Sequence, residues 1–214
     1  MISDFMTELI IGLIMAVIIG VIDIIFKLNF WDQLKKKMML RLTGGGIADS
    51  YPYEIALKKM KRLLTEPLPP RVVRIMCFSG KDLTSESGLL KEIKTFLAND
   101  GKCEFLLMSP QSKRVRERGQ EIGKDENTLI MNFENTIINL NDKFKRYYPG
   151  NVKVKIYDQL PLFRMNFIGN VLFLGLYGEE RSYANIFYEI PTTSPLYHIF
   201  EKLFERTWED GKDV

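Results

Sequence analysis

The chain has 214 residues, of which 46% are hydrophobic, and its formal net charge is only +3. A charge this small does not by itself predict a nucleic-acid-binding protein. With two cysteines and one histidine, the sequence offers neither a disulfide framework nor a Cys and His cluster for a metal ion. We therefore predict no metal site and no cofactor.

The first segment, Leu9 to Phe26 (LIIGLIMAVIIGVIDIIF), predicts a transmembrane helix. It carries one charged residue, Asp23, and at ~1.5 Å per residue it reaches ~27 Å, close to the hydrocarbon thickness of a bilayer. A buried core helix is the alternative. Basic residues follow the segment, from Lys27 to Arg41, and none precedes it. We therefore expect a single-pass protein of the inner membrane, with its N-terminus outside and its C-terminal domain in the cytoplasm.

A stripe of small residues runs along this segment. Gly12, Ala16 and Gly20 recur every four residues, and Glu8 and Asp23 extend the stripe at its ends. Small residues let spanning helices approach closely, so the stripe predicts a homo-oligomer in which the two acidic residues could line a cation path. In the alternative interpretation, Asp23 reaches the cytoplasmic interface and the glycines have no role.

The chain is predicted to divide into three parts. Residues 1–30 hold the transmembrane helix, and residues 31–46 hold a basic amphipathic segment that ends in a glycine hinge, Gly44 to Gly46. Residues 47–214 are long enough to form one well-buried cytosolic domain.

Helices and strands alternate in the first half of this domain. Apolar spacing predicts helices at residues 53–64, 89–100, 111–122 and 127–147, and apolar strands at residues 71–78 and 103–109. The order of strand, helix and strand indicates a βαβ unit with a parallel pair. Cys77 and Cys103 lie in these strands, where we expect buried, reduced thiols.

Four strands and a helix follow. The strands are predicted at residues 152–158, 163–168, 171–177 and 184–190, and a turn at Gly169-Asn170 joins the middle two as a hairpin. Ser194 and Pro195 then begin a helix that runs to residue 210. Helical spacing predicts that Ile55, Ile138 and Ile199 are buried. The fold class is α/β, with one mixed sheet.

The loop from Ser79 to Gly88 leads from a strand into the start of a helix. Backbone N–H groups at such a junction bind phosphate, and serine and lysine side chains of the loop could assist them. The candidate phosphate ligands are Ser79, Gly80, Lys81, Ser85 and Ser87. Capping of the helix by Thr84 or Ser85 is the alternative role for this loop.

Two stretches resemble the phospholipase D-like superfamily, in a divergent bacterial branch that has lost catalysis. The first is RVVRIMCFSGKDLTSESGLLKEIKTFLANDGKCEFLLMSPQSKRVRERG, and the second is FRMNFIGNVLFLGLYGEERSYANIFYEI, followed by SPLYHIFEKLFERTW. The resemblance implies a phospholipase D-like fold over residues 71–208. Active members need H-x-K-x4-D, in which the histidine attacks a phosphodiester. Here the corresponding strand reads Arg164-Met165-Asn166, and His198, the single histidine, lies in the last helix, where we expect a surface or satisfied residue. We predict no catalytic residue.

The resemblance also implies a phosphate-binding polar face on this strand and the next. The candidate ligand-binding residues there are Arg164, Asn166, Tyr177 and Arg181. We expect Arg164 and Asn166 to point outward, at neighbouring outward positions of one strand. Arginine can bind phosphate bidentately without performing a reaction. In the alternative interpretation, Arg164 pairs with Asp158 or Glu179 on a solvated sheet face.

Together these features predict a membrane-anchored sensor and effector. Its non-catalytic cytosolic domain would bind a nucleotide or another phosphate-containing signal, or a partner protein, and would change the packing of oligomeric transmembrane helices so that the membrane leaks or depolarises. The architecture resembles small transmembrane effectors of bacterial antiviral defence. Two alternatives stay open: a membrane-bound phosphodiesterase or nuclease, and an anchor that recruits a partner protein.

Overall fold

A computed structural model describes residues 46–66, 72–159, 162–177 and 186–214. These residues belong to one unit, Gly46–Val214. The predicted spanning segment Leu9–Phe26 lies outside them, and so do Glu8, Gly12, Ala16, Gly20 and Asp23. Among the residues that are described, no helix is both long and apolar enough to cross a bilayer. The transmembrane helix and its oligomer therefore stay predictions from the sequence.

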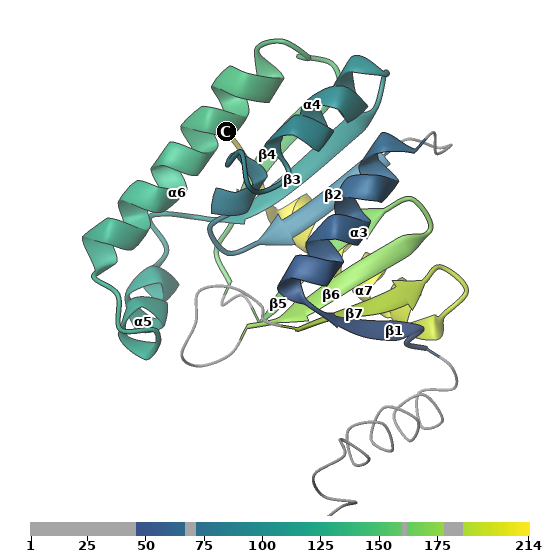
Figure 1. Ribbon diagram of the computed structural model, residues 1–214. Helices are drawn as coiled ribbons and strands as arrows, with labels where there is room; N and C mark the ends of the chain where they lie inside the picture. Colours follow the sequence, from purple (N-terminus) through teal and green to yellow (C-terminus); the bar gives the residue numbers. More distant parts are fainter. Residues whose placement is uncertain (1–45, 67–71, 160–161, 178–185) are drawn as a thin grey trace, which may run out of the picture. The chain divides into compact units, whose positions relative to one another are not determined.

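A single mixed sheet organises the domain (Figure 1). Its strands lie in the order β1-β7-β6-β5-β2-β3-β4-β8. In chain order they are β1 (Asp49–Pro52), β2 (Val72–Cys77), β3 (Lys102–Met108), β4 (Val152–Tyr157), β5 (Phe163–Ile168), β6 (Val171–Leu176), β7 (Ile186–Pro191) and β8 (Lys212–Asp213). Strands β2, β3 and β4 are parallel to one another, and the remaining neighbours are antiparallel. The predicted parallel pair and the mixed α/β class are confirmed.

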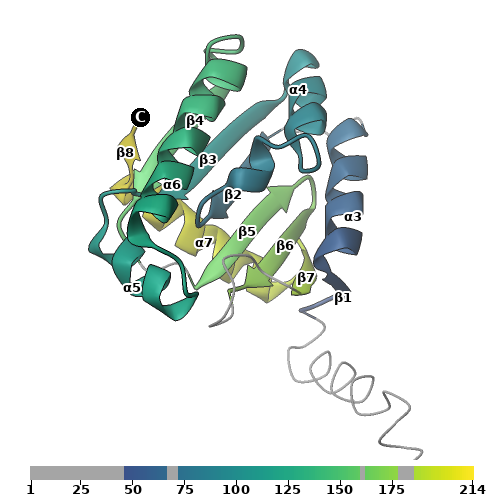
Figure 2. The same ribbon diagram turned by 60° about the vertical axis from the view of Figure 1, so that its left-hand side comes forward.

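Helices cover both faces of the sheet. Helices α3, α4 and α6 lie over one face, and α7 crosses the other, as the two views in Figures 1 and 2 show. The helices are α3 (Tyr53–Thr65), α4 (Leu90–Ala98), α5 (Lys113–Glu121), α6 (Glu126–Leu140) and α7 (Pro195–Asp210), with a 3₁₀ turn η1 (Lys81–Leu83) and a π-helical turn η2 (Asn141–Lys145). Helix α7 begins as predicted, because the Ser194 Oγ accepts a hydrogen bond of 3.1 Å from the Leu196 N–H and Pro195 takes the first helical position.

The two faces of the sheet have separate apolar cores. Side chains alternate along a strand, so Ile75 of β2 joins the core beneath α3 and α4, whereas Met76 joins the core beneath α7. The free thiols of Cys77 and Cys103 are buried in the first core, as predicted. The hairpin is also confirmed, since Ile168 pairs with Val171 across a turn in which Gly169 adopts a φ of 60°.

Three predicted core residues lie at the surface instead. Ile55, Ile138 and Ile199 are 47%, 55% and 60% exposed, so their predicted burial is wrong. The buried face of each of these helices is narrower than its apolar residues suggest. In α6 and α7 this buried face also includes a polar residue. Thr136 and Thr207 are buried because each hydroxyl donates to the carbonyl four residues earlier in its own helix. The long helix predicted at residues 127–147 ends at Leu140 and continues as η2.

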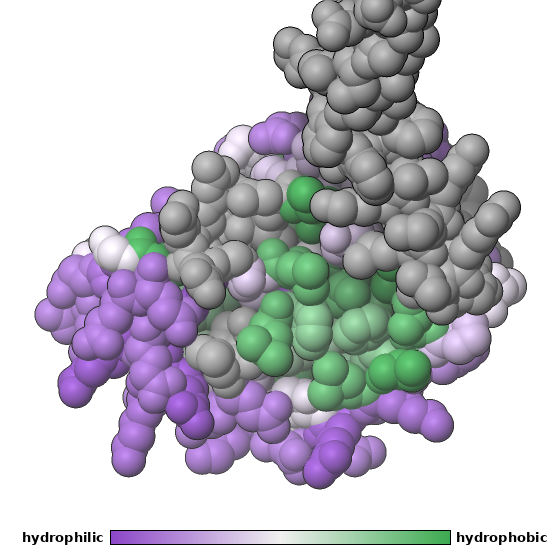
Figure 3. Space-filling model, turned by 90° about the horizontal axis from the view of Figure 1, so that it is seen from below, coloured by the Kyte–Doolittle hydropathy of each residue, from purple (hydrophilic) through white to green (hydrophobic). Residues whose placement is uncertain are grey.

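Apolar side chains also gather at one end of the sheet (Figure 3). Leu162, Leu176 and Ile186 are 61%, 46% and 50% exposed. Leu162 directly precedes β5, and Leu176 at the end of β6 pairs with Phe163 at the start of β5. Ile186 begins β7, the antiparallel neighbour of β6, so all three residues lie at the same end of the sheet. This end of the sheet is therefore more apolar than an ordinary solvated strand end.

Candidate functional site

A cavity of about 450 Å³ opens beside the carboxyl end of β2. Its walls come from the start of α3, the loop after β2, the residues around the N-terminal half of α6, and the ends of β5 and β6. The lining residues are Tyr53, Glu54, Ser79, Gly80, Lys81, Asp82, Ser85, Ser87, Lys124, Leu129, Asn132, Arg164 and Tyr177. Cavities that bind small molecules in proteins have volumes of about 300–1,000 Å³.

The loop Ser79–Gly88 forms one wall and is tightly folded. Gly80 adopts a φ of 61°, and a Cβ atom there would lie 2.9 Å from a methyl group of Leu107, so glycine is required. The Ser85 Oγ accepts a hydrogen bond of 3.1 Å from the Gly88 N–H. Ser85 therefore closes this turn and does not cap α4, whose cap residue is Leu89.

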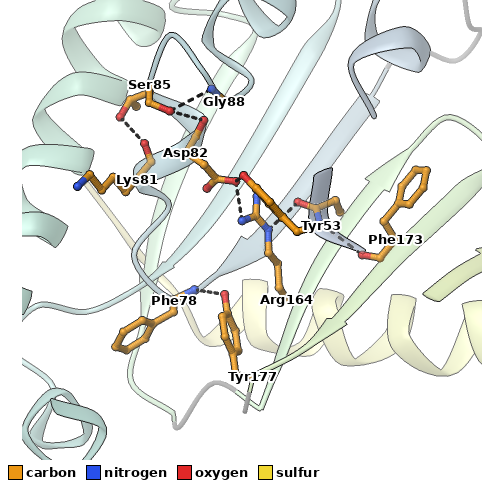
Figure 4. A network of polar contacts seen from close by, with 11 residues as sticks. Tyr53, Phe78, Lys81, Asp82, Ser85, Gly88, Arg164, Phe173 and Tyr177 are labelled. Carbon is orange, nitrogen blue, oxygen red and sulfur yellow. Dashed lines mark hydrogen bonds and ion pairs between the residues drawn. The ribbon is translucent and has the colours of Figure 1, made fainter. Parts of the chain in front are cut away.

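Arg164 of β5 is the central charged residue of the site. Its side chain points to the face that α3 covers, and the residue is only 4% exposed. Nη1 forms an ion pair of 2.6 Å with Oδ2 of Asp82, and Nε donates to Oδ1 of Asn166 at 3.3 Å (Figure 4). Nη2 is buried and has no hydrogen-bond partner among the residues described. The guanidinium thus keeps unused donor capacity at the cavity.

Neighbouring groups hold this arrangement in place. The Asn166 amide donates to the Phe173 carbonyl at 3.4 Å, which fixes the oxygen that receives Arg164. The Tyr53 hydroxyl donates to Oδ2 of Asp82 at 3.1 Å. The Tyr177 hydroxyl accepts a hydrogen bond of 2.9 Å from the Phe78 N–H. Figure 4 shows Tyr53, Asp82 and Arg164 meeting at one point although they come from α3, η1 and β5.

Burial and charge set the protonation states of the site. Burial acts to lower the pKa of Arg164, but the Asp82 carboxylate and other neighbours outweigh it, so the pKa is raised and the guanidinium stays charged. Burial raises the pKa of both Tyr53 and Tyr177 above the ordinary value. Both hydroxyls are therefore neutral at physiological pH, and Tyr53 serves as a donor to the carboxylate.

Two expectations for β5 are wrong. Arg164 and Asn166 do not point outward, because α3 packs over this face of the strand, and Asn166 is fully buried. Asn166 is not among the cavity-lining residues; it orients Arg164 instead. The ion-pair partner of Arg164 is Asp82 and not Asp158, which is exposed. Arg181 and Glu179 lie outside the described residues.

The structure brings most of the other candidates together. Ser79, Gly80, Lys81 and Tyr177 all line the cavity, as do Ser85 and Ser87. Sequence reasoning missed Tyr53, Glu54, Asp82, Lys124 and Asn132. Asp82 lies next to Lys81 in the loop already singled out, but the others come from helices and connections with no chemical motif.

The single histidine is remote from this site. His198 lies on α7, on the opposite face of the sheet, and its side chain is 61% exposed, 3.5 Å from Glu201. It is a surface histidine, as predicted. Across the described parts of the chain, no group of His, Cys, Asp and Glu residues is arranged to hold a metal ion.

Comparisons with known proteins show the fold and not the activity. No protein-family model matches the chain, and neither does any curated protein sequence. Among solved structures, the phosphatidylserine synthase of Haemophilus influenzae Rd KW20 matches at a TM-score of 0.51 and 14% identity, over 72% of this chain and 36% of that one. The chain thus corresponds to about a third of that enzyme's length.

Two further structures match at lower scores. Nuc of Salmonella typhimurium, a phospholipase D family member, has a TM-score of 0.45 and 10% identity, over 78% of this chain and 96% of that one. The archaeal chromatin protein TrmBL2 has a TM-score of 0.46 and 14% identity, over 92% and 68%. At a TM-score of 0.51, the match to the phosphatidylserine synthase shows a similar fold and nothing about activity.

Proposed function

We propose that this domain is the sensor of a membrane-anchored effector and binds a phosphate-containing small molecule in the cavity. The observation that carries the proposal is the buried guanidinium of Arg164, a lining residue of the cavity, whose Nη2 has no partner in the part of the chain that the structure describes. A buried polar group without a partner costs about 1–3 kcal/mol, and more when it is charged. An anionic ligand would satisfy this group.

Phosphate is the anion that the surrounding residues fit best. A guanidinium presents paired N–H donors that match two phosphate oxygens. Lys81 and Lys124 add positive charge to the lining, and the serines of the loop add hydroxyl donors. Glu54 supplies an acceptor for ligand hydroxyl groups. A nucleotide combines these features, since it carries phosphate, sugar hydroxyls and a base that could pack against Tyr53 or Tyr177.

The proposed output lies in the N-terminal segment. Leu9–Phe26 would span the inner membrane and associate through Gly12, Ala16 and Gly20, with Glu8 and Asp23 facing the interface. Ligand binding in the cytoplasmic domain would change this packing and permeabilise or depolarise the membrane, in the manner of effectors of antiviral defence. The domain itself would not be catalytic, because the strand that carries the nucleophile in active members has no histidine.

Binding is tested first, with the detergent-solubilised full chain. Calorimetric titration with inorganic phosphate, ATP and cyclic dinucleotides should show binding of at least one of them. Arg164→Gln should weaken that binding by about 100-fold, as expected when a charged hydrogen bond to a ligand is lost. Arg116→Gln is the matched control, because it removes an equal charge from α5, outside the cavity. Binding that the two variants weaken equally would contradict the proposal.

The output is tested separately in cells. Inducing the protein should depolarise the membrane, as followed with a potential-sensitive dye, and Gly12→Leu or Gly20→Leu should abolish the effect. Arg164→Gln should change the extent of this depolarisation without lowering the amount of protein in the membrane. If the membrane potential stays unchanged under every inducing condition, the proposed membrane output is wrong, and only the binding function stands.

A further inference from the structure

Nη2 of Arg164, the donor without a partner among the described residues, is buried and not open to solvent, although Arg164 is a lining residue of the cavity. Asp82 holds the adjoining Nη1 at 2.6 Å, and the side chain of Asp82 is 20% exposed. A carboxylate thus occupies the place where an anion entering the cavity would meet the guanidinium. A phosphate group that contacts Nη1 of Arg164 therefore has to displace Asp82.

Movement of Asp82 has a direct consequence for α3. Oδ2 of Asp82, the oxygen paired with Arg164, also accepts the hydrogen bond of the Tyr53 hydroxyl. A phosphate bound to Arg164 would repel this carboxylate, because two anions would then share one cation. A displacement that separates Asp82 from Arg164 would therefore also act on the hydrogen bond of Tyr53.

Tyr53 lies near the start of the domain in the chain. It is the first residue of α3 and follows β1, which starts at Asp49, close to the beginning of the domain at Gly46. Strand β1 is an edge strand of four residues, paired with β7 in the part of the chain that is described. A short edge strand is among the elements that open at the lowest free energy.

We propose that Asp82 is an internal competitor for the phosphate site, and that an anion which displaces it releases Tyr53 and loosens β1 and the start of α3. This inference rests on the proposed function and specifies how the site is regulated. In the empty site, the Asp82 carboxylate covers Arg164 and holds Tyr53, which keeps β1 paired with the sheet. The bound anion uncovers Arg164 and loosens β1. Because coupling is reciprocal, opening of β1 raises the affinity for the anion by the same factor by which the anion favours that opening.

Two measurements on the detergent-solubilised full chain test this coupling, with pyrophosphate as the probe. Asp82→Asn removes the competing charge and keeps the shape, so it should bind pyrophosphate about 10-fold more tightly than the native chain. Glu86→Gln, which neutralises an exposed carboxylate of the same loop, is the matched control and should leave the affinity unchanged. Equal or weaker binding by Asp82→Asn would overturn the inference.

Hydrogen exchange supplies the second measurement. Pyrophosphate should speed exchange in residues 49–56 of the native chain by about 10-fold relative to β3. Tyr53→Phe should produce the same increase without pyrophosphate, and it provides an independent test should Asp82→Asn fold poorly. If pyrophosphate binds but exchange in β1 and α3 stays unchanged, the coupling is refuted and the ligand site stands. If neither the native chain nor Asp82→Asn binds pyrophosphate or the nucleotides, both proposals fall.

Discussion

Replacing Asp82 with alanine is expected to destabilise the domain by about 3 kcal/mol, because the variant leaves a buried guanidinium without its counter-ion. At the Nη1 to Oδ2 distance of 2.6 Å, Coulomb's law with an effective dielectric constant of about 20 gives an attraction of about 6 kcal/mol. Desolvation of the two ions offsets much of this. Removing one partner of a buried pair costs about 3–5 kcal/mol. The low end applies because the side chain of Asp82 is 20% exposed, so the pair is not fully desolvated.

The opposite truncation should cost less. Arg164→Met removes the deeply buried charge, whereas Asp82 keeps the Tyr53 hydrogen bond and its contact with solvent. We expect a loss of about 1 kcal/mol, the size of one net hydrogen bond. The double variant should be more stable than Asp82→Ala alone, since no unpaired charge remains in it.

The two cysteines provide the assay for these variants. Cys77 and Cys103 are each 1% exposed, and they are the only cysteines of the full chain. Their labelling by a thiol reagent therefore reports opening of the domain, and its dependence on urea gives the free energy of unfolding without removing the N-terminal segment. Glu86→Ala is the control. If Asp82→Ala and Glu86→Ala both lose less than about 0.5 kcal/mol, the ion pair does not stabilise the fold as argued.

Three further predictions concern residues that support the cavity. Gly88→Ala should unfold the η1 loop and abolish pyrophosphate binding by calorimetry, because its Cβ would lie 1.7 Å from the Asp82 carbonyl oxygen. Tyr177→Phe should lower the free energy of unfolding by about 1–2 kcal/mol, since the buried Phe78 N–H loses its acceptor. Burial raises the pKa of Cys77 from 9.0 to about 12; its thiol therefore favours folding below pH 9, and this contribution, about 4 kcal/mol, is lost between pH 9 and 12. Circular dichroism should show a smaller alkaline loss of stability for Cys77→Ala than for the native chain.

The central sheet is predictable from local pattern. Strands β2 and β3 are runs of apolar and β-branched residues, and the Gly169-Asn170 turn marks the hairpin of β5 and β6. The outer strands carry no such signal. Strand β1 reads DSYP and ends in proline, and β8 has two residues, so both exist only because a neighbouring strand offers hydrogen-bonding groups.

Only the part of the site that is built from consecutive residues was predictable. The Ser79–Gly88 loop follows a strand, and this position alone predicted a ligand-binding wall. The orientation of Arg164 was not predictable, because an arginine on a strand is ordinarily placed on the solvated face. Its burial depends on α3, which reaches it through the tertiary fold and brings Tyr53 to the same point. No spacing in the sequence encodes that contact.

The Arg164–Asp82 pair is not explained by stability. A hydrophobic side chain at position 164 could pack against the Phe187 ring, whose centroid lies 5.8 Å from the guanidinium carbon, and replacing buried ion pairs by apolar residues is often neutral or stabilising. Asp82 also lies in a loop turn and not in an adjacent strand, so the pair can separate without breaking the sheet. A buried charge with a detachable counter-ion is what a site needs if an incoming anion is to take the counter-ion's place. In the proposed coupling, the same separation frees Tyr53. A role in binding and signalling would therefore explain why the domain buries a charged residue at position 164 despite its free-energy cost.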